Sequence, residues 1–177
     1  PGEFIPTLEK NGKVMKVDVY IWEQVCKTIR KWMNEGKKPV PISVNVSRID
    51  IFSVDVPTVF SNLINIYNID PKYLEIEVTE SAFMDDTRIL KSVIQRLREK
   101  GFTILIDDFG SGYSSLNMLK DVQADILKMD MKFFDLNSSN YEKGVSIIKS
   151  VVDLSKNMKL TIIAEGVETS EQINLLK

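Results

Sequence analysis

Two adjacent aspartates, Asp107 and Asp108, follow directly after the apolar residues 104–106. Neighbouring like charges repel one another, and burying a carboxylate without a partner is costly. A positive group must therefore lie close to them. It is either a basic side chain such as Lys128, which would make a structural ion-pair network, or a bound cation, which would make a metal site.

Side chains of types that bind metal or act in catalysis also stand at the ends of the other apolar stretches. They are Asn45 at the first, Glu77 and Glu80 at the second, Lys128 and Asp130 at the fourth, and Glu165 and Glu168 at the fifth. Carboxylate and amide oxygens are the ligands that Mg2+ and Mn2+ prefer. A lysine that faces such a site can orient water or stabilise phosphoryl charge. With five stretches contributing, the pattern favours the metal site over the ion-pair network.

The residues that are missing restrict the chemistry further. The chain has no histidine and one cysteine, Cys26. The absence of histidine removes Ser-His-Asp catalysis, Cys-His catalysis and histidine zinc sites. Cys26 shares an amphipathic stretch with Trp22 and Ile29, so we expect a buried, inert thiol.

The composition is that of one globular domain. The 177 residues are 44% hydrophobic and 27% charged, which is enough to form a core. A net charge of -2 argues against a nucleic acid polymer as partner. We see neither a secretory leader nor an apolar run long enough to span a membrane, and we expect a cytoplasmic location. Because the chain begins with Pro1, we expect it to be a piece of a longer protein.

Strand-like apolar runs alternate with helical patterns along the chain. Strands are predicted over 42–46, 73–78, 102–106, 124–129 and 160–164. The predicted helices are 19–35 with Asp18 as N-cap and Gly36 as stop, 57–67, 86–100 before Gly101, a short one from Ser114, 142–158 after a polar loop at 137–140, and a last one capped by Thr169 or Ser170.

This alternation predicts a parallel α/β sheet. A doubly wound sheet gathers ligands at one switch point, whereas a barrel gathers functional groups from every strand at one mouth. Because every strand ends on such a group, we predict a (β/α)8 TIM-barrel-like fold. A whole barrel needs about 250 residues and eight strands. The chain shows about five β/α units, so we predict a single partial domain over 1–177.

Six sequence blocks resemble EAL domains, the bacterial cyclic di-GMP phosphodiesterases. They are FIP at 4–6, SVNVS at 43–47, EVTES at 77–81, DDFGSGYSS at 107–115, LKMD at 127–130 and AEGVET at 164–169. The similarity runs in order from about Phe4 to Lys177. It implies a modified (β/α)8 barrel that hydrolyses cyclic di-GMP to linear pGpG.

The resemblance also implies a site with two metal ions, either Mg2+ or Mn2+. Asn45, Glu77 and Asp107 match the ligands of one ion. Asp107, Asp108 and Glu165 match the ligands of the second. Two ions of this kind activate water and neutralise the phosphate.

Further roles follow for residues beside these ligands. Lys128, Asp108 and Glu165 are expected to be catalytic, with Lys128 helping to position the attacking water. Asp130 is expected to lie close to the substrate.

Glu80 matches the residue that holds the loop after the third strand, 108–115, in shape. That loop is linked in the family to the binding of substrate and metal and to dimer contacts, so a homodimer is expected.

Two segments of the family pattern lie outside this sequence. They are the Glu-Ala-Leu signature, normally upstream of FIP, and the barrel-closing segment, normally downstream of Lys177. We therefore expect impaired hydrolysis by this chain and a parent with other signalling domains. Two alternatives stay open. One is a catalytically inactive EAL-like cyclic di-GMP receptor or protein-interaction module, and the other is an unrelated barrel enzyme that abstracts protons with metal and lysine.

Overall fold

The structure, a computed structural model, describes residues 5–83, 87–110, 116–130 and 141–176. Its strands are β1 (Ile42–Asn45), β2 (Leu74–Thr79), β3 (Thr103–Phe109), β4 (Ile126–Met129) and β5 (Thr161–Ala164). Its α-helices are α1 (Ile5–Lys10), α2 (Val14–Asn34), α3 (Arg48–Ser53), α4 (Val56–Tyr67), α5 (Thr87–Glu99), α6 (Leu116–Asp121), α7 (Tyr141–Asn157) and α8 (Ser170–Leu175). Two 3-10 turns, η1 (Pro71–Tyr73) and η2 (Glu80–Phe83), flank β2.

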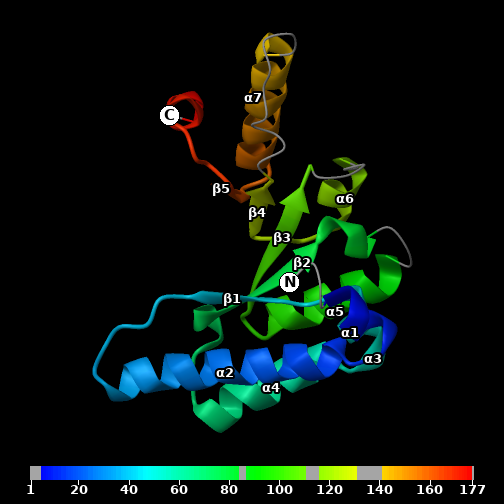
Figure 1. The fold of residues 1–177 in the computed structure, drawn as a ribbon, viewed down its shortest axis with the longest axis vertical. Helices are drawn as coiled ribbons and strands as arrows, with labels where there is room; N and C mark the ends of the chain where they lie inside the picture. Colours follow the sequence, from blue (N-terminus) through cyan, green and yellow to red (C-terminus); the bar gives the residue numbers. More distant parts are fainter. Residues whose placement is uncertain (1–4, 84–86, 111–115, 131–140, 177) are drawn as a thin grey trace.

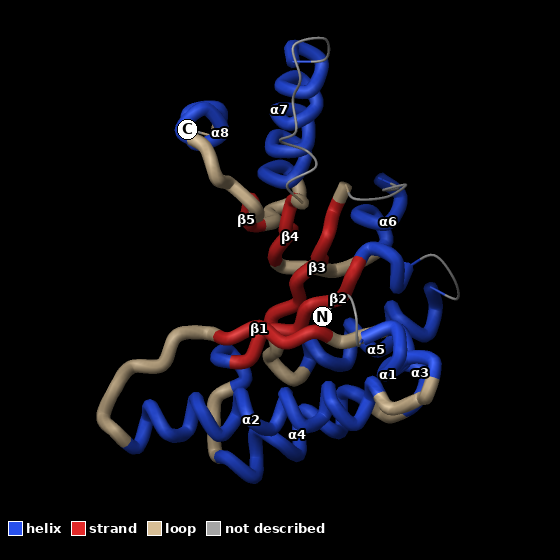
Figure 2. The backbone as a smooth tube through the Cα atoms, in the orientation of Figure 1, coloured by secondary structure: helices blue, strands red, loops and turns tan. Residues whose placement is uncertain are grey.

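The five strands form one parallel sheet in the order β1-β2-β3-β4-β5. Each strand therefore pairs with the next one in the sequence, as in a barrel wall, and the order does not reverse as it does in a doubly wound sheet. Figures 1 and 2 show an open, twisted sheet with α2 and α4 side by side beneath it. The predicted α/β class with five units in an unclosed sheet is confirmed.

The two faces of the sheet differ in chemistry because side chains alternate along each strand. One face is apolar and buried under the helices, and its central members are Val44, Val46, Leu74, Ile76, Val78, Ile104, Ile106, Leu127 and Met129. The other face carries Asn45, Glu77, Asp107 and Lys128. The sheet thus supplies a core on one side and a group of polar side chains near the strand ends on the other.

Aromatic rings join α2 and α4 to the sheet. Trp22 and Phe60 are fully buried, and their ring centroids lie 4.6 Å apart. Phe60 also packs against Phe102, at 5.8 Å between centroids. Such contacts combine large buried area with favourable ring geometry. These rings therefore fix the helical layer against β1 and β3.

Most predicted element boundaries lie within two residues of those in the structure, but two predictions need correction and two helices were missed. Asp18 is not the N-cap of the long helix, because α2 begins one turn earlier, at the buried Val14. The third strand continues past 106 to Phe109, so it contains the two aspartates. The short helices α1 and α3 were not predicted.

Thr169 caps the last helix as predicted, accepting a hydrogen bond from the Gln172 backbone N–H at 3.2 Å. Three predicted features lie outside the described residues. They are the loop 137–140, the helix start at Ser114 and the first residue of helix 86–100. In the part of the chain that the structure describes, no helix combines the length and the apolar character needed to cross a bilayer.

We expect Cys26 to resist thiol reagents in the folded protein. Its side chain is fully buried, and burial raises the pKa of the thiol to about 11. Because the thiolate is the nucleophile, this pKa alone slows alkylation at about pH 8 by roughly a hundredfold, and burial slows it further. Mass spectrometry after maleimide treatment, with and without guanidinium, measures the effect. Equal rates in both conditions would show that Cys26 is not enclosed.

Candidate active site

One ammonium group lies among three carboxylates on the polar face of the sheet. Lys128 Nζ is 2.9 Å from Glu77 Oε1, 2.9 Å from Asp107 Oδ1 and 3.0 Å from Glu165 Oε1. The Lys128 and Glu77 side chains are only 11% and 8% exposed, and Glu165 is 42% exposed. The cluster therefore has a buried floor and one side open to solvent.

The register of the sheet explains this convergence. Glu77 on β2 pairs with Asn45 on β1 and with Leu105 on β3, and Thr79 pairs with Asp107. Lys128 on β4 pairs with Ile163 on β5. Laterally paired residues of a parallel sheet share a face, and so do residues two apart in one strand. Asn45, Glu77, Asp107 and Lys128 are consequently directed to one face near the carboxyl ends of their strands.

Glu165 follows β5 and extends this set. Its backbone N–H donates to the Met129 carbonyl at 3.0 Å, which continues the ladder between β4 and β5 by one residue. Glu165 shares parity with Ile163, the partner of Lys128, so its carboxylate reaches the ammonium.

The cluster is electrostatically unbalanced. Burial by itself lowers the pKa of Lys128, but the contacts with Glu77, Asp107 and Glu165 outweigh it, so the net shift is upward. Lys128 therefore stays protonated at neutral pH. Three carboxylates nevertheless face one ammonium, which leaves an excess of negative charge at the carboxyl end of the sheet.

Asp108 lies at an irregularity of β3 that changes the alternation of side chains. The register with β4 shifts between Ile106 and Phe109, and Asp108 has a positive φ of 57°. An extra residue of this kind is a β-bulge, which re-aims the side chains beside it. Burial, and next the charges of Asp107, Asp130 and Glu165, raise the pKa of Asp108. The bulge thus keeps Asp108 within electrostatic reach of the acidic cluster.

Glu80 contacts the beginning of the loop after β3. Its Oε2 accepts a hydrogen bond from the Gly110 N–H at 3.2 Å, and Glu80 is buried. Gly110 has a positive φ of 94°, which favours glycine. The expected role of Glu80 in holding the whole loop stays a prediction, because residues 111–115 lie outside the described part of the chain.

Asn45 and Asp130 lie beside the cluster, each at or next to the end of a strand. Asn45 is exposed beside Glu77, and no hydrogen bond or ion pair links its side chain to the carboxylates within the described ranges. Asp130 follows β4, and its N–H donates to the Phe109 carbonyl at 3.2 Å. The structure therefore brings Glu77, Asp107, Lys128 and Glu165 into contact and places Asn45, Asp108 and Asp130 around them.

The donor set suits a hard divalent cation. Carboxylates and an amide meet at one edge of the sheet, where negative charge is in excess. The buried Asp107 Oδ1 accepts no hydrogen bond of good geometry, although Lys128 Nζ lies 2.9 Å away. In the described residues, no three His, Cys, Asp or Glu side chains already have the spacing needed to ligate one ion. The arrangement seen is the ion-pair network that the sequence left open, built from residues chemically suited to Mg2+ or Mn2+.

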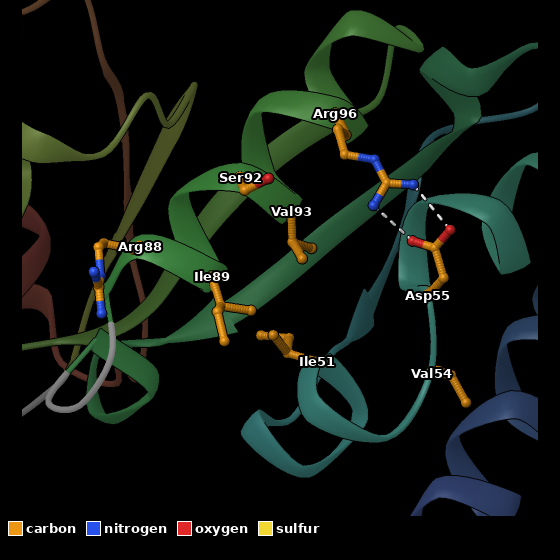
Figure 3. Close-up of a pocket in the computed structure, with 8 residues that line it drawn as sticks. All are labelled: Ile51, Val54, Asp55, Arg88, Ile89, Ser92, Val93 and Arg96. Atoms are coloured by element: carbon orange, nitrogen blue, oxygen red, sulfur yellow. Dashed lines mark hydrogen bonds and ion pairs between the residues drawn. The ribbon is translucent and has the colours of Figure 1, made fainter.

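A pocket on the helical side of the sheet lies among different residues. It has a volume of about 520 Å3 and is lined by Ile51, Val54, Asp55, Arg88, Ile89, Ser92, Val93 and Arg96. Figure 3 shows the paired carboxylate and guanidinium of Asp55 and Arg96 at its rim, 2.8 Å apart. Because no strand-end residue contributes to it, this pocket is separate from the candidate active site.

Two features of the site were missed in the sequence. One is the bulge at Asp108, for which a run of two acids after an apolar strand is no specific signal. The other is a capping box formed by Ser47 and Asp50 directly after Asn45. The spacing Ser-x-x-Asp before an apolar residue is a signal that could have revealed it.

Comparisons with known proteins identify a family that matches the whole chain. Residues 1–177 match the family described as EAL domain. The signaling protein YkoW of Bacillus subtilis is 36% identical over 176 residues, covering 99% of this chain and 22% of its own length. The bifunctional diguanylate cyclase/cyclic di-GMP phosphodiesterase MucR of Pseudomonas aeruginosa is 33% identical over 176 residues, covering 99% of this chain and 26% of its own length.

A solved structure, the PaMucR phosphodiesterase in complex with c-di-GMP, has a TM-score of 0.88 and 32% identity. The match covers 99% of this chain and 76% of that one. Of the two curated relatives, YkoW and MucR, the chain spans only about a quarter of the length.

Proposed function

Because the chain belongs to the EAL domain family, we propose that it forms the catalytic part of a phosphodiesterase for cyclic di-GMP. The proposed reaction needs divalent metal and opens one phosphodiester of the cyclic dinucleotide to give linear pGpG. The names of relatives that are cyclic di-GMP phosphodiesterases support the substrate and the reaction class.

One observation carries the proposal. Carboxylates from β2, β3 and the end of β5 converge on the Lys128 ammonium within 3.0 Å, at the carboxyl end of a parallel sheet. Functional groups of barrel enzymes gather at that end. A cluster with one cation and several carboxylates suits a reaction in which phosphoryl charge must be stabilised.

The proposed metal ligands follow the two sets expected from the sequence. Asn45, Glu77 and Asp107 would hold one ion, and Asp107, Asp108 and Glu165 would hold a second. When bound, Mg2+ or Mn2+ would supply Lewis-acid stabilisation of the phosphoryl group and lower the pKa of water.

The chain's own side chains would position the reactants. The Lys128 ammonium can donate hydrogen bonds to the attacking water or to a phosphoryl oxygen, since it stays protonated. Water adds its oxygen to phosphorus, and the bond between phosphorus and the ribose 3′ oxygen breaks. That oxygen takes up a proton and leaves as a hydroxyl group, so the product keeps a 5′ phosphate. Asp130 and the loop supported by Glu80 would border the substrate.

We expect pGpG formation to require Mg2+ or Mn2+ and to stop when EDTA is added. The assay uses this chain and any longer protein that contains it, with cyclic di-GMP as substrate and chromatography of the nucleotides as readout. Asn45→Ala and Glu77→Ala should each lower turnover by at least roughly a hundredfold, because each removes a proposed metal ligand.

Asn62→Ala and Glu142→Ala are the matched controls, because both residues are exposed and lie on helices. Full turnover in the Asn45 or Glu77 variant would contradict the site assignment. Tight binding of cyclic di-GMP by the longer protein without pGpG would instead support the receptor alternative.

Several expectations from the sequence stay predictions. They are the single partial domain, the homodimer, the cytoplasmic location, additional signalling domains and the impaired activity of this chain alone.

A further inference from the structure

The turn that follows Asn45, residues 45–47, is fixed by hydrogen bonds from three elements. The Val46 N–H donates to the Glu77 carbonyl on β2 at 2.8 Å. Trp22 on α2 and Asp50 on α3 supply the other contacts. Val46 is also buried, so its side chain anchors the turn in the core.

Trp22 contacts the backbone of Asn45 directly. Its Nε1–H donates to the Asn45 carbonyl oxygen at 2.9 Å, and the ring is fully buried against Phe60. A carbonyl at the last residue of an edge strand has no partner strand beyond it, so the indole supplies a fixed donor. Since the ring cannot move without disturbing the core, this hydrogen bond fixes the backbone from which the Asn45 side chain projects.

Asp50 holds the other side of the turn. Its Oδ2 accepts from the Ser47 N–H at 2.8 Å and from the Ser47 hydroxyl at 2.6 Å. The Ser47 hydroxyl in turn accepts from the Asp50 N–H at 3.2 Å, which completes a capping box. Asp50 is fully buried, and its Oδ1 has no hydrogen-bond partner in the described residues. Burying a carboxylate is costly, which points to a role that a shorter apolar residue could not fill.

The helix that carries Asp50 is itself anchored. Ile51 is 5% exposed and points toward Ile89 in the pocket between α3 and α5 (Figure 3). The capping box therefore connects the Asn45 turn to a helix that is packed against α5. The position of Asn45 thus depends on α2, α3 and β2 together.

We propose that Trp22 and Asp50 are positioning residues for Asn45, holding its side-chain amide where it can serve as a metal ligand. The inference rests on the proposed function, because it takes Asn45 to be a ligand. Trp22 contacts the carbonyl of Asn45, and Asp50 contacts the N–H and hydroxyl of Ser47, so both would act through residues 45–47. Outer residues that orient ligands in this way contribute strongly to metal affinity.

The test compares two tryptophans on the same helix. Trp22→Phe keeps an aromatic ring but removes the N–H donor. Trp32→Phe is the control, because it makes the same change at a half-buried tryptophan ten positions further along α2. We expect Trp22→Phe to weaken Mn2+ binding, measured by calorimetry without substrate, by about tenfold, and Trp32→Phe to leave it unchanged. In an Asn45→Ala background, Trp22→Phe should add no further loss.

Asp50 provides an independent arm. Asp50→Asn keeps an oxygen that can accept from Ser47, so it should retain most of the Mn2+ affinity that Asp50→Ala loses. Hydrogen exchange of the Ser47 amide should accelerate in Asp50→Ala, which reports loosening of the turn directly.

The outcomes separate the two proposals. If Asn45→Ala leaves Mn2+ affinity and turnover unchanged, the assigned role of Asn45 fails, and the positioning role fails with it. If Asn45→Ala weakens both while Trp22→Phe and Asp50→Ala bind Mn2+ like the wild type, the positioning role alone is wrong.

Discussion

Lys128→Met is expected to abolish phosphodiesterase activity, with turnover falling by at least about a hundredfold. Methionine is close to lysine in length but carries no charge. The Glu77, Asp107 and Glu165 carboxylates would therefore face one another without the ammonium that lies within 3.0 Å of each. The proposed stabilisation of phosphoryl charge would be lost at the same time. Chromatography of pGpG measures the effect in whichever protein, this chain or a longer one that contains it, forms pGpG in the assay described above.

The same change should also lower stability in the presence of EDTA. Glu77 is buried, and removing one partner of a buried ion pair costs about 3–5 kcal/mol. Chemical unfolding followed by circular dichroism gives the difference. Lys149→Met, at an exposed position of α7, serves as the control and should change neither property. Normal turnover in the Lys128 variant would contradict its assignment as a catalytic residue.

Phe60→Ala is expected to reduce the free energy of unfolding by about 3–5 kcal/mol. Phe60 is fully buried between Trp22 and Phe102, so truncation leaves a cavity where α2, α4 and the sheet meet. The loss would be a large part of the stability of a domain of this size. Denaturant titration measures it, and Cys26 alkylation offers a second readout because α2 borders the same cavity.

Ile66→Ala is the matched control, because this residue lies on the same helix but is 71% exposed. We expect a change below about 0.5 kcal/mol there. Similar losses at both positions would mean that the Phe60 cluster does not form the core.

The sequence allowed the five parallel strands to be predicted because they depend on strong local signals, but it placed the end of the third strand three residues too early. Continuous apolar runs identified the buried strands, and Asn45, Glu77 and Glu165 stood at their ends. In a parallel sheet such positions meet at one edge, so the partnership of Glu77, Asp107 and Lys128 follows from topology.

The errors have equally physical causes. The short helix α1 has six residues, too few for a clear helical period. The equally short α3 begins with a capping box whose spacing was overlooked. The start of α2 was misplaced because Asp18 is a good N-cap type, while burial of Val14 extends the helix by one turn. The choice between ion pairing and metal binding at Asp107 depends on atomic positions that no spacing rule contains.

The bulge at Asp108 has a consequence for anyone who redesigns this domain. A backbone φ of 57° is strained for residues with a side chain. Aspartate tolerates this conformation better than most residues, and glycine adopts it freely. Asp108→Gly would relax the backbone and at the same time remove a carboxylate from the rim. Stability and the proposed metal binding therefore pull in opposite directions at this position, and a screen that rewards heat resistance alone would select against the carboxylate.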